Sequence, residues 1–513
     1  MIEAATLWEL VERRAEATPD ALFAVDDRDR RMRFDEYRAA AERCAAGLFA
    51  LGIEEGTRVS WQLPTTLEAL VLAAALARLG AVQNPILPIY RRREVAFATG
   101  QLGAAHLFVP PALRGFDHAA MAREVAAGQP GLAVHVVDDT LPEGDRAGLP
   151  APMPREVQRS AVHWIFYTSG TTAEPKGARH SDAGLLAASA GMSAALRLGP
   201  DDRVALVFPF THVGGILWLM NGLRAGCAQI VIPVFDPATS IDVLARHGVT
   251  QAGAGTVFHQ AYLAAQRARG GPPIFPAVRA FPGGGAPKPP QLHFDLKREI
   301  GGAGIVAGYG MTECPVLAMS SPDDPDEKLA HTEGRACPPH MQIRVVKPDG
   351  STAAAGEEGE LRVKGPQLCQ GYLDPALDEE AFDEEGFFRT GDLGYLDADG
   401  YVVISGRLKD VIIRKGENIS AREIEDLLFT HPKVRDAAVV GLPDPETGER
   451  ACAVVVCRDP ADPLTFDEMT GFLRERDLIV QKIPERLELV GELPRNPTGK
   501  VLKHELRRRL SSS

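Results

Sequence analysis

A segment of small hydroxyl and glycine residues, TSGTTAEPKG at 168–177, has the composition of a phosphate-binding loop. Backbone N–H groups in such a turn can form an anion nest, and the hydroxyls add further donors. Its lysine, Lys176, precedes Gly177, whereas the P-loop pattern G-x-x-x-x-G-K-[ST] places the lysine after its second glycine. On this segment alone, a phosphate-binding loop and a surface turn rich in small residues explain the pattern equally well.

Two later segments, FPGGGAPKPP at 281–290 and GIVAGYGMTE at 304–313, are rich in glycine. Glycine lets a flat ring or a phosphate approach the backbone closely. Glu313 ends the second segment and could hold Mg²⁺, a cation that prefers carboxylate and phosphate oxygens. Taken alone, neither segment separates a binding site from an ordinary glycine-rich turn.

Three charged residues nearer the C-terminus extend this set. The segment at 387–410 contains Asp392, a carboxylate that can accept hydrogen bonds from two ribose hydroxyls, and Arg407, a planar donor for ribose or phosphate oxygens. In LPRNPTGKVLK, Lys500 follows a turn rich in proline and glycine. By itself, this late lysine is explained at least as well as a solvated surface charge.

The elements around these residues indicate an α/β fold. Apolar helical stretches alternate with short β-branched stretches, which is the pattern of a mostly parallel sheet. We expect helices at 67–79, 215–224 and 238–247 and strands at 204–208 and 228–233. AVHWIFY at 161–167 is expected to be the strand before the loop, and a helix is expected from near Ser181. From about residue 342, short strands and tight turns indicate an antiparallel β subdomain.

A last unit is expected from Arg407 onward. Ser420 and Glu423 have the spacing of a capping box, and two strand candidates and a helix at 465–477 follow. We therefore predict an N-terminal domain at 1–406 and a C-terminal domain at 407–513, with GRLKDVIIRKG as a hinge.

The bulk properties exclude several classes of protein. A chain of 513 residues is too long for one hydrophobic core, and a net charge of −13 argues against a nucleic-acid-binding surface while leaving ATP and coenzyme A open. Seven scattered cysteines without a C-x-x-C pair indicate reduced thiols. The N-terminal stretch lacks the apolar core of a signal peptide, and the most apolar helix is too short to span a bilayer. We expect a soluble, cytoplasmic protein without stable membrane insertion.

Together, the order, spacing and identity of these motifs resemble the adenylate-forming (ANL) superfamily, which includes acyl-CoA synthetases, peptide-synthetase adenylation domains and firefly luciferase. The resemblance extends from about residue 5 to 510. The family loop reads [ST]-S-G-[ST]-T-G-x-P-K-G, and this chain departs from it at Ala173, where a Cβ would restrict the loop if the position needs a positive φ. The resemblance implies a large N-terminal domain of α/β subdomains plus a β subdomain, and a small mobile C-terminal α+β lid.

It also implies a reaction in which a carboxylate attacks the α-phosphate of ATP and expels pyrophosphate, so that charge on a crowded phosphate must be neutralised. The residues that match the loop, expected around the leaving pyrophosphate, are Thr168, Ser169, Gly170, Thr171, Thr172 and Lys176. Those expected to form the adenine side of the nucleotide site are Gly283, Gly284, Gly285, Ala286, Gly308, Tyr309 and Gly310. Asp392 and Arg407 would bind the ribose.

The remaining assignments concern catalysis. Thr312 would touch the α-phosphate, and Glu313, together with Thr168, would hold Mg²⁺. Lys500 would bridge the attacking carboxylate and the phosphate, arriving from the C-terminal domain. His212 is placed with this catalytic group as well as with the acid-binding residues.

The acid itself is expected to be apolar. Family members that activate amino acids carry an aspartate near the start of the segment that here reads FPFTHVGGILW (208–218), and no acidic residue occurs there. Residues 212–215 resemble the acyl-pocket wall of CoA ligases, although a core turn with an incidental histidine is the alternative. The expected pocket residues are His212, Val213, Gly214, Gly215 and Phe258. NPILPIYRRRE (84–94) resembles ligases for alicyclic and medium-chain acids, so we expect a medium-chain fatty or alicyclic acid and a place in fatty acid metabolism.

The C-terminal domain resembles that of ligases that form thioesters. VIIRKGENIS matches the motif that lines the pantetheine channel after the lid rotates, and Gly416 lies where a side chain would block the thiol. Lys409 matches the hinge position. Because Lys500 is needed for adenylation and must then leave, rotation lets one site run both half-reactions.

We therefore expect an AMP-forming acyl-CoA synthetase that uses ATP, Mg²⁺ and coenzyme A. One alternative is a ligase that loads the acyl group onto a carrier-protein phosphopantetheine. Another is a degenerate acyl-AMP-binding protein, which the intact set of motif residues argues against. A second copy of the chain in a homodimer, and a lysine acetyltransferase and deacetylase acting on Lys500, are the candidate protein partners, because acetylation removes the lysine's charge.

Overall fold

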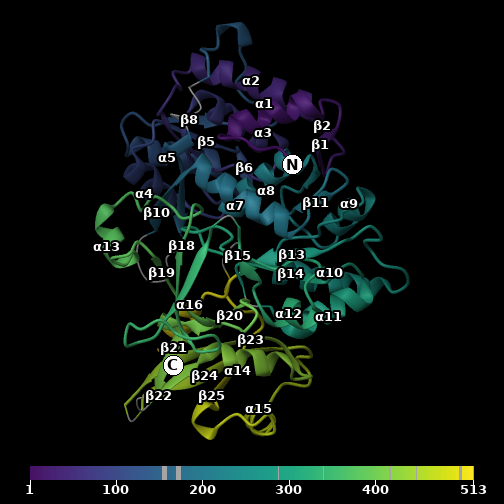
Figure 1. The fold of residues 1–513 in the computed structure, drawn as a ribbon, viewed down its shortest axis with the longest axis vertical. Coiled ribbons are helices and arrows are strands. Elements are labelled where there is room, and N and C mark those ends of the chain that lie inside the picture. The colour runs from purple at the N-terminus through teal and green to yellow at the C-terminus, as the bar shows by residue number, and fades with distance from the viewer. Residues whose placement is uncertain are drawn as a thin grey trace.

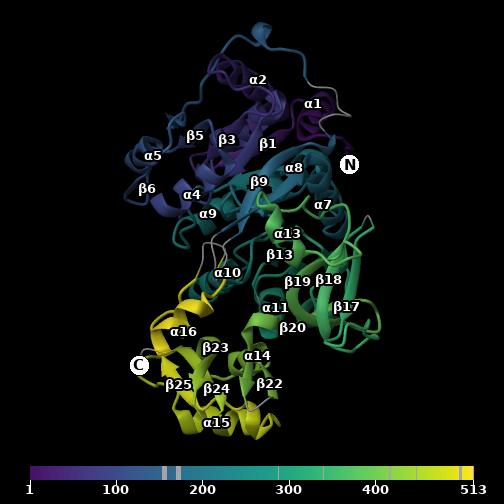
Figure 2. The same ribbon diagram turned by 90° about the vertical axis from the view of Figure 1, so that its left-hand side faces the viewer.

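The computed structural model describes residues 1–152, 159–168, 175–286, 288–338, 340–414, 417–445, 447–495 and 499–511. They form a large N-terminal part built from α/β and β units and a smaller C-terminal α+β unit, in agreement with the expected fold class. Two views at right angles show the C-terminal unit at the end of the molecule away from helices α1 (Leu7–Ala17) and α2 (Phe34–Ala50) (Figures 1 and 2). No helix of the described residues is long and apolar enough to cross a membrane.

Two mostly parallel sheets form the first part of the chain. The larger has the strand order β10-β9-β4-β3-β5-β8 and is parallel except where β10 pairs with β9. The smaller has the order β11-β12-β1-β2 and is parallel except where β2 pairs with β1. The strands are β1 (Leu22–Asp26), β2 (Arg31–Arg33), β3 (Arg58–Trp61), β4 (Val82–Pro85), β5 (His106–Val109), β8 (Ala133–Val136), β9 (Val162–Thr168), β10 (Lys176–Ser181), β11 (Arg203–Leu206) and β12 (Ala228–Val231).

The helices beside these sheets begin and end where the sequence supplies caps. Helix α3 (Leu67–Leu79) follows Thr66, whose side chain accepts a hydrogen bond from the Ala69 amide, and it ends at Gly80 with φ 71°. The predicted helix at 67–79 is therefore confirmed. The other elements of this part are α4 (Arg92–Leu102), α5 (His118–Ala127), α7 (Asp182–Ala195), α8 (Val213–Ala225), α9 (Ser240–Arg246), the pair β6 (Ala112–Leu113) and β7 (Phe116–Asp117), and the 3-10 turn η1 (Arg146–Gly148).

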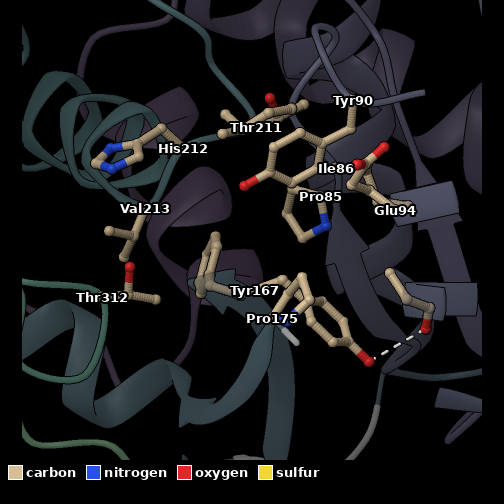
Figure 3. A pocket seen from close by; sticks show the side chains of 13 residues that line it. Pro85, Ile86, Tyr90, Glu94, Tyr167, Pro175, Thr211, His212, Val213 and Thr312 are labelled. Carbon is tan, nitrogen blue, oxygen red and sulfur yellow. Dashed lines mark hydrogen bonds between the residues drawn. The ribbon is translucent and has the colours of Figure 1, made fainter. Parts of the chain in front are cut away.

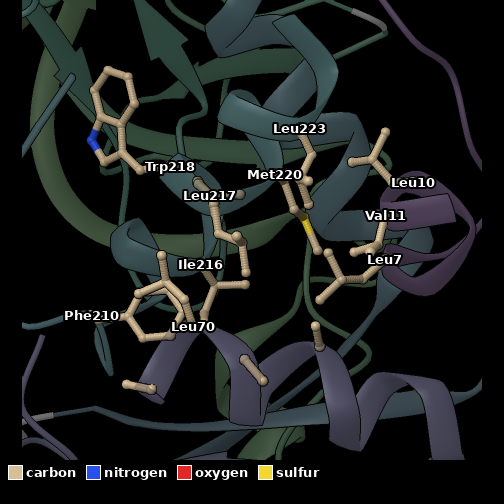
Figure 4. Packing of buried hydrophobic residues seen from close by; sticks show 14 of the residues in the cluster. Leu7, Leu10, Val11, Leu70, Phe210, Ile216, Leu217, Trp218, Met220 and Leu223 are labelled. Carbon is tan, nitrogen blue, oxygen red and sulfur yellow. The ribbon is translucent and has the colours of Figure 1, made fainter. Parts of the chain in front are cut away.

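A large apolar cluster joins these helices. Side chains of α1, α3 and α8 meet in it, as Figure 4 shows for Leu7, Leu10, Val11, Leu70, Ile216, Leu217, Met220 and Leu223. Each of these side chains is almost completely buried. The packing matters for function because it fixes α8, whose N-terminal end carries several of the predicted acid-binding residues.

The middle of the chain adds a mixed sheet and an antiparallel sheet. The mixed sheet has the order β13-β14-β15-β16, and β13 and β14 are its parallel pair. The β subdomain predicted from about residue 342 is present as the antiparallel order β17-β18-β19-β20. The elements are α10 (Thr256–Arg269), β13 (Phe281–Gly284), α11 (Pro290–Glu299), β14 (Ile305–Tyr309), β15 (Ala318–Met319), α12 (Asp326–His331), β16 (Arg335–Ala336), β17 (Gln342–Val346), β18 (Gly359–Lys364), η2 (Pro375–Leu377), α13 (Asp378–Ala381), β19 (Phe388–Leu396) and β20 (Val402–Arg407).

The C-terminal unit is a sheet with the order β22-β21-β24-β23, to which β25 adds along β24. Ser420 caps α14 by accepting a hydrogen bond from the Glu423 amide, as the predicted capping box requires of its first residue. The elements are η3 (Leu408–Asp410), β21 (Val411–Arg414), β22 (Glu417–Ser420), α14 (Ala421–Phe429), β23 (Val434–Asp444), β24 (Gly448–Cys457), α15 (Phe466–Arg474), η4 (Val480–Lys482), β25 (Arg486–Leu489) and α16 (Lys503–Ser511).

The helix expected from near Ser181 is present as α7, but the strand before it was not predicted from the sequence. The segment after the glycine-rich loop does not lead directly into a helix: it first forms β10, which returns antiparallel along β9 and pairs Lys176 with Thr168. Ser181 then caps α7. A strand forms here because β10 has a partner edge in β9, a tertiary contact that a local sequence pattern does not contain.

Candidate active site

Three side chains from different strands, those of Tyr309, Asp392 and Arg407, meet at one place. The Tyr309 hydroxyl donates to Asp392 Oδ2 at 2.7 Å, and Arg407 Nε lies 2.6 Å from Asp392 Oδ1. The register of β19 and β20 places Asp392 opposite Arg407. Burial, and then the neighbouring carboxylate, hold the pKa of Tyr309 well above its usual value, so the phenol keeps its proton. Each carboxylate oxygen has two lone pairs, so Asp392 can still accept hydrogen bonds from a ligand.

These residues line a cavity of about 820 Å³ between the N-terminal part and the C-terminal unit. Most of the predicted nucleotide residues that the structure describes border it, and so do both lysines that were predicted in the C-terminal unit. The predicted residues in its lining are Gly285, Ala286, Gly308, Tyr309, Gly310, Asp392, Arg407, Lys409 and Lys500. The structure thus brings together residues that are up to 215 positions apart in the chain, from Gly285 to Lys500.

Lys500 reaches the same place from the C-terminal unit. Burial lowers its pKa to about 8; the charges of Arg407 and Lys409 act in the same direction, and those of Asp392 and Asp410 oppose them. A lysine with this pKa is still mostly protonated at neutral pH. The ammonium therefore contributes positive charge to the cavity beside the Asp392–Arg407 pair.

Glycine is required at the positions of the two glycine-rich segments for different structural reasons. A Cβ on Gly283 would lie 2.7 Å from the His259 ring, and one on Gly284 would collide with the carbonyl of Gly308. Both glycines are therefore required by the protein's own packing. Gly285 and Gly308 line the cavity, and a side chain there would meet no atom of the described structure closer than 3.8 Å. Gly285 has φ 76°, a backbone conformation that itself favours glycine, so close approach of a ligand, the reason expected from the sequence, fits Gly308 alone among these four.

Thr312 and Glu313 follow β14 and are held by neighbouring side chains. His180 Nε2 lies 2.8 Å from the Thr312 carbonyl oxygen, and burial lowers the pKa of His180 to about 4, so its ring is neutral and donates this bond. The Tyr372 hydroxyl donates to Glu313 Oε1 at 2.6 Å. Lys176 Nζ lies 5.3 Å from the centre of the Tyr372 ring. The predicted magnesium ligand and the predicted pyrophosphate lysine therefore both lie close to one tyrosine.

Five predicted residues lie outside the described residues, namely Ser169, Gly170, Thr171, Thr172 and Gly416. The ends of the loop are nevertheless placed, because Thr168 and Lys176 face each other across β9 and β10. Among the described residues, no group of three or more histidine, cysteine, aspartate or glutamate side chains could hold a metal ion. The single carboxylate of Glu313 still fits Mg²⁺, which is often bound by one or two carboxylates while its other ligands are waters and phosphates.

A second, smaller cavity of about 20 Å³ lies beside Thr312. Figure 3 shows His212, Val213 and Thr312 on one side and Tyr90, Tyr167 and Glu94 on the other. His212 and Val213 therefore border a cavity, and their role as the wall of the acid pocket stays a prediction. The sequence did not single out Tyr90, Glu94 or Tyr167, although the first two lie in the segment at 84–94 that was noted for its resemblance to ligases.

Three other predicted acid-binding residues lie elsewhere. Gly214 and Gly215 are outside the residues that line this cavity, and a Cβ on Gly215 would lie 2.6 Å from the Cα of Phe210. Phe258 lies outside the linings of both cavities, and its ring packs edge to face against Phe235 with the centres 4.9 Å apart. Gly215 and Phe258 thus have packing roles within the protein.

His212 itself caps helix α8. Its Nδ1 accepts a hydrogen bond from the Gly214 amide at 3.1 Å. Burial lowers the pKa of His212 to about 4, so the ring is neutral at physiological pH. A capping role explains the histidine structurally, and its place among the catalytic residues stays a prediction.

The comparisons with known proteins agree with this geometry. A family model described as AMP-binding enzyme matches residues 11–373, and the model of its C-terminal domain matches residues 423–500. The chain is 31% identical to a medium-chain fatty-acid–CoA ligase of Escherichia coli over 98% of its own length and 90% of the relative. It is 33% identical to a salicyl-AMP ligase / salicyl-S-ArCP synthetase of Mycobacterium tuberculosis over 98% and 91%.

Solved structures of MatB from Rhodopseudomonas palustris give a further comparison. The ATP-bound form superimposes with a TM-score of 0.87 at 30% identity, covering 99% of both chains. The apo form of the same protein gives 0.76 at 29% identity with the same coverage. The overall structure of this chain is therefore more similar to the ATP-bound form of that protein than to its apo form.

Proposed function

Because the chain belongs to the AMP-binding enzyme family of the adenylate-forming superfamily, we propose that it is an ATP-dependent ligase that converts a carboxylic acid to acyl-AMP and then to acyl-CoA. The observation that carries this proposal is the convergence of Tyr309, Asp392, Arg407 and Lys500 on one cavity. Its medium-chain and salicyl-activating relatives support an adenylating ligase.

In the first half-reaction, a carboxylate oxygen of the acid bonds to the α-phosphorus of ATP, and the bond to the bridging oxygen breaks to release pyrophosphate. Two anions must approach each other, so positive charge aimed at both lowers the barrier. We assign this role to Lys500, because its ammonium lies in the cavity beside Arg407. Lys176, at the end of the glycine-rich loop, is assigned to the departing pyrophosphate.

The nucleotide is held by the groups around Asp392. In the proposed complex, the carboxylate accepts hydrogen bonds from ribose hydroxyls while Arg407 and Tyr309 fix its two oxygens. The adenine lies along the backbone at Gly285 and Gly308, where no side chain stands in the way. Glu313, with Thr168 at the loop, would hold Mg²⁺, which supplies charge neutralisation at the phosphates when bound.

In the second half-reaction, the thiol of coenzyme A attacks the acyl carbon and AMP leaves. Lys500 has no task in this step, so we propose that the C-terminal unit turns about Lys409 and withdraws it. Gly416 would then border the channel for the pantetheine arm. Under this proposal, the domain boundary falls at Arg407, between the last strand of the β subdomain and the C-terminal sheet.

The acceptor is the point on which the relatives differ, since the name of the M. tuberculosis relative includes a carrier-protein product. The test is AMP formation from ATP over a panel of carboxylic acids, with coenzyme A or a phosphopantetheinylated carrier protein as acceptor. Acid-dependent AMP and a thioester on free coenzyme A are expected. A thioester found only on the carrier protein would show that the carrier protein, and not free coenzyme A, is the acceptor. Absence of pyrophosphate release with every acid would refute the proposal.

The acid is proposed to have an apolar, compact body. Pro85, Ile86, Leu87, Phe166 and Val213 line the smaller cavity. About 20 Å³ is little more than the space of one water molecule. Every carboxylic acid would require these walls to move, and a compact acid requires the least movement, so we favour a short or compact acid over the medium-chain acid expected from the sequence.

A further inference from the structure

The smaller cavity contains hydroxyl groups that the protein leaves unsatisfied. Tyr90 Oη and Thr211 Oγ1 are both buried and have no hydrogen-bond partner among the described residues. Both residues line the cavity beside Thr312 and Val213. Figure 3 shows the Tyr90 hydroxyl pointing toward the side of the cavity on which His212 and Val213 lie. Two unpaired hydroxyls thus occur at the place where the acid is proposed to bind.

Nearby hydroxyls show that this is not the general condition of the region. Tyr167 lines the same cavity and donates to the Ala98 carbonyl at 3.1 Å. Thr65 donates to the Phe208 carbonyl at 2.8 Å. A buried polar group without a partner costs free energy, and native structures contain few of them. Tyr90 and Thr211 therefore have hydrogen-bonding capacity left for a ligand, since no other described residue uses it.

The third polar group of the cavity is the carboxylate of Glu94. One of its oxygens accepts a hydrogen bond from the Arg91 amide at 3.1 Å, as part of the capping box of α4. A carboxylate has further lone pairs, and Glu94 lies in the lining. Its negative charge disfavours a second carboxylate on the ligand. Burial raises the pKa of Tyr90 to about 12, so the phenol stays neutral and can donate.

A hydroxyl can pair with each of these three groups, because it donates one hydrogen bond and accepts two. It can donate to Glu94 and accept from Tyr90 or Thr211. An unsubstituted hydrocarbon would fill the cavity but leave both protein hydroxyls desolvated and unpaired. A site of this kind discriminates strongly against analogues that lack the hydroxyl.

We propose that the acid activated by this enzyme carries a hydroxyl group on a compact carbon skeleton, and that Tyr90, Thr211 and Glu94 recognise it. The proposal rests on the proposed function and narrows its substrate class. The expected substrate changes from an apolar acid to an acid with one hydroxyl group. The apolar walls of the cavity still enclose its carbon skeleton.

The test compares acids of equal skeleton that differ in one hydroxyl: butanoate with 3- and 4-hydroxybutanoate, cyclohexanecarboxylate with its 3- and 4-hydroxy derivatives, and benzoate with the three hydroxybenzoates. Succinate serves as the dicarboxylate arm. The readout is kcat/KM for acid-dependent AMP formation with the full-length protein. At least one hydroxylated acid should exceed its parent by about tenfold or more. Equal values within every pair, or a preference for succinate, would overturn the inference.

Two near-isosteric variants test the named residues. Tyr90→Phe should lower kcat/KM for the hydroxylated acid about tenfold while leaving the parent acid within about twofold, and Thr211→Val should act in the same direction. Tyr37→Phe is the matched control, because it removes a buried hydroxyl that donates to the Leu70 carbonyl, outside both cavity linings. It should destabilise the protein without changing the ratio between the acids. If Tyr90→Phe and Thr211→Val lower both members of each pair equally, the assignment is wrong.

The outcomes separate the two proposals. If no acid supports AMP formation, the proposed function fails and the inference fails with it. If unsubstituted acids are activated and their hydroxylated partners gain nothing, the ligase proposal stands and only the hydroxyl site is refuted.

Discussion

The pKa of Lys500 makes the rate of adenylation depend on pH in a way that can be assigned to one residue. Burial, reinforced by Arg407 and Lys409, lowers this pKa to about 8. The ammonium, which is the form proposed to act, is then present in about 90% of molecules at pH 7 and about 10% at pH 9. Because the pH dependence of kcat/KM reports groups of the free enzyme, kcat/KM for ATP should fall about tenfold per pH unit above pH 8.

The assay is acid-dependent exchange of pyrophosphate into ATP at subsaturating ATP between pH 6.5 and 9.5. At saturating ATP the decline should move to higher pH, since the phosphates favour the charged lysine. Thioester formation from supplied acyl-AMP should not show this decline, because Lys500 is proposed to have left the site.

Two variants identify the group. Lys500→Ala should lower adenylation by about 10²–10³, the usual cost of removing a contact that forms in the transition state. Lys500→Arg should be less active than the parent but should lose the decline above pH 8, because a guanidinium stays charged there. A decline near pH 8 that persists unchanged in Lys500→Arg would refute the assignment.

Three further predictions concern glycines and the nucleotide. Gly215→Ala should lower the melting temperature by several degrees because its Cβ meets the Phe210 backbone, whereas Gly214→Ala, whose nearest contact is a side-chain atom 3.2 Å away, should change it less; equal melting temperatures would contradict this. Gly416→Leu should keep pyrophosphate exchange near the parent rate and lose most acyl-CoA formation, with acyl-AMP visible by mass spectrometry; normal acyl-CoA formation would reject the channel. Asp392→Asn should raise the KM for ATP about tenfold or more in the same exchange assay, since a charge-assisted contact is lost; an unchanged KM would remove Asp392 from the ribose site.

The outline of the fold could be predicted because local patterns and tertiary packing agree. The helix at 67–79 is a run of alanine and leucine with a threonine before it and a glycine after it, and both caps are present in the structure. The antiparallel sheet after residue 342 was predicted from short strand-like stretches separated by turn residues, and it is present in the structure. Strand β10 was missed because its pairing with β9 depends on a neighbour in space and not on its own composition.

The site was predictable where the chemistry is carried by charged side chains in recognisable motifs, and less so where a residue type has several uses. Gly283 and Gly284 match a nucleotide motif, yet the structure shows that their own neighbours exclude a side chain. Tyr90, in contrast, was not predicted from the sequence as a site residue. A tyrosine is unremarkable in a sequence, and only the three-dimensional environment reveals that its hydroxyl is buried without a partner among the described residues.

The contacts between the two parts of the chain bear on the proposed rotation. The apolar clusters of the N-terminal part draw on residues up to 404, and those of the C-terminal unit on residues from 412 onward, so no cluster of described residues spans the junction. Polar contacts do cross it. Ser420 donates to the Ser405 carbonyl at 2.6 Å, and Arg422 lies 3.7 Å from Glu333.

A junction of this kind can open at low cost. Separating polar groups at a partly exposed interface returns them to water, whereas separating a shared core would expose apolar surface at roughly 25 cal/mol per Å². Opening would also relieve the burial that lowers the pKa of Lys500. Under the proposed mechanism, ATP would work against opening, because its phosphates would pair with that ammonium, and the loss of pyrophosphate would remove much of this attraction. The chemistry of the first half-reaction would thereby release the unit that the second half-reaction requires to move.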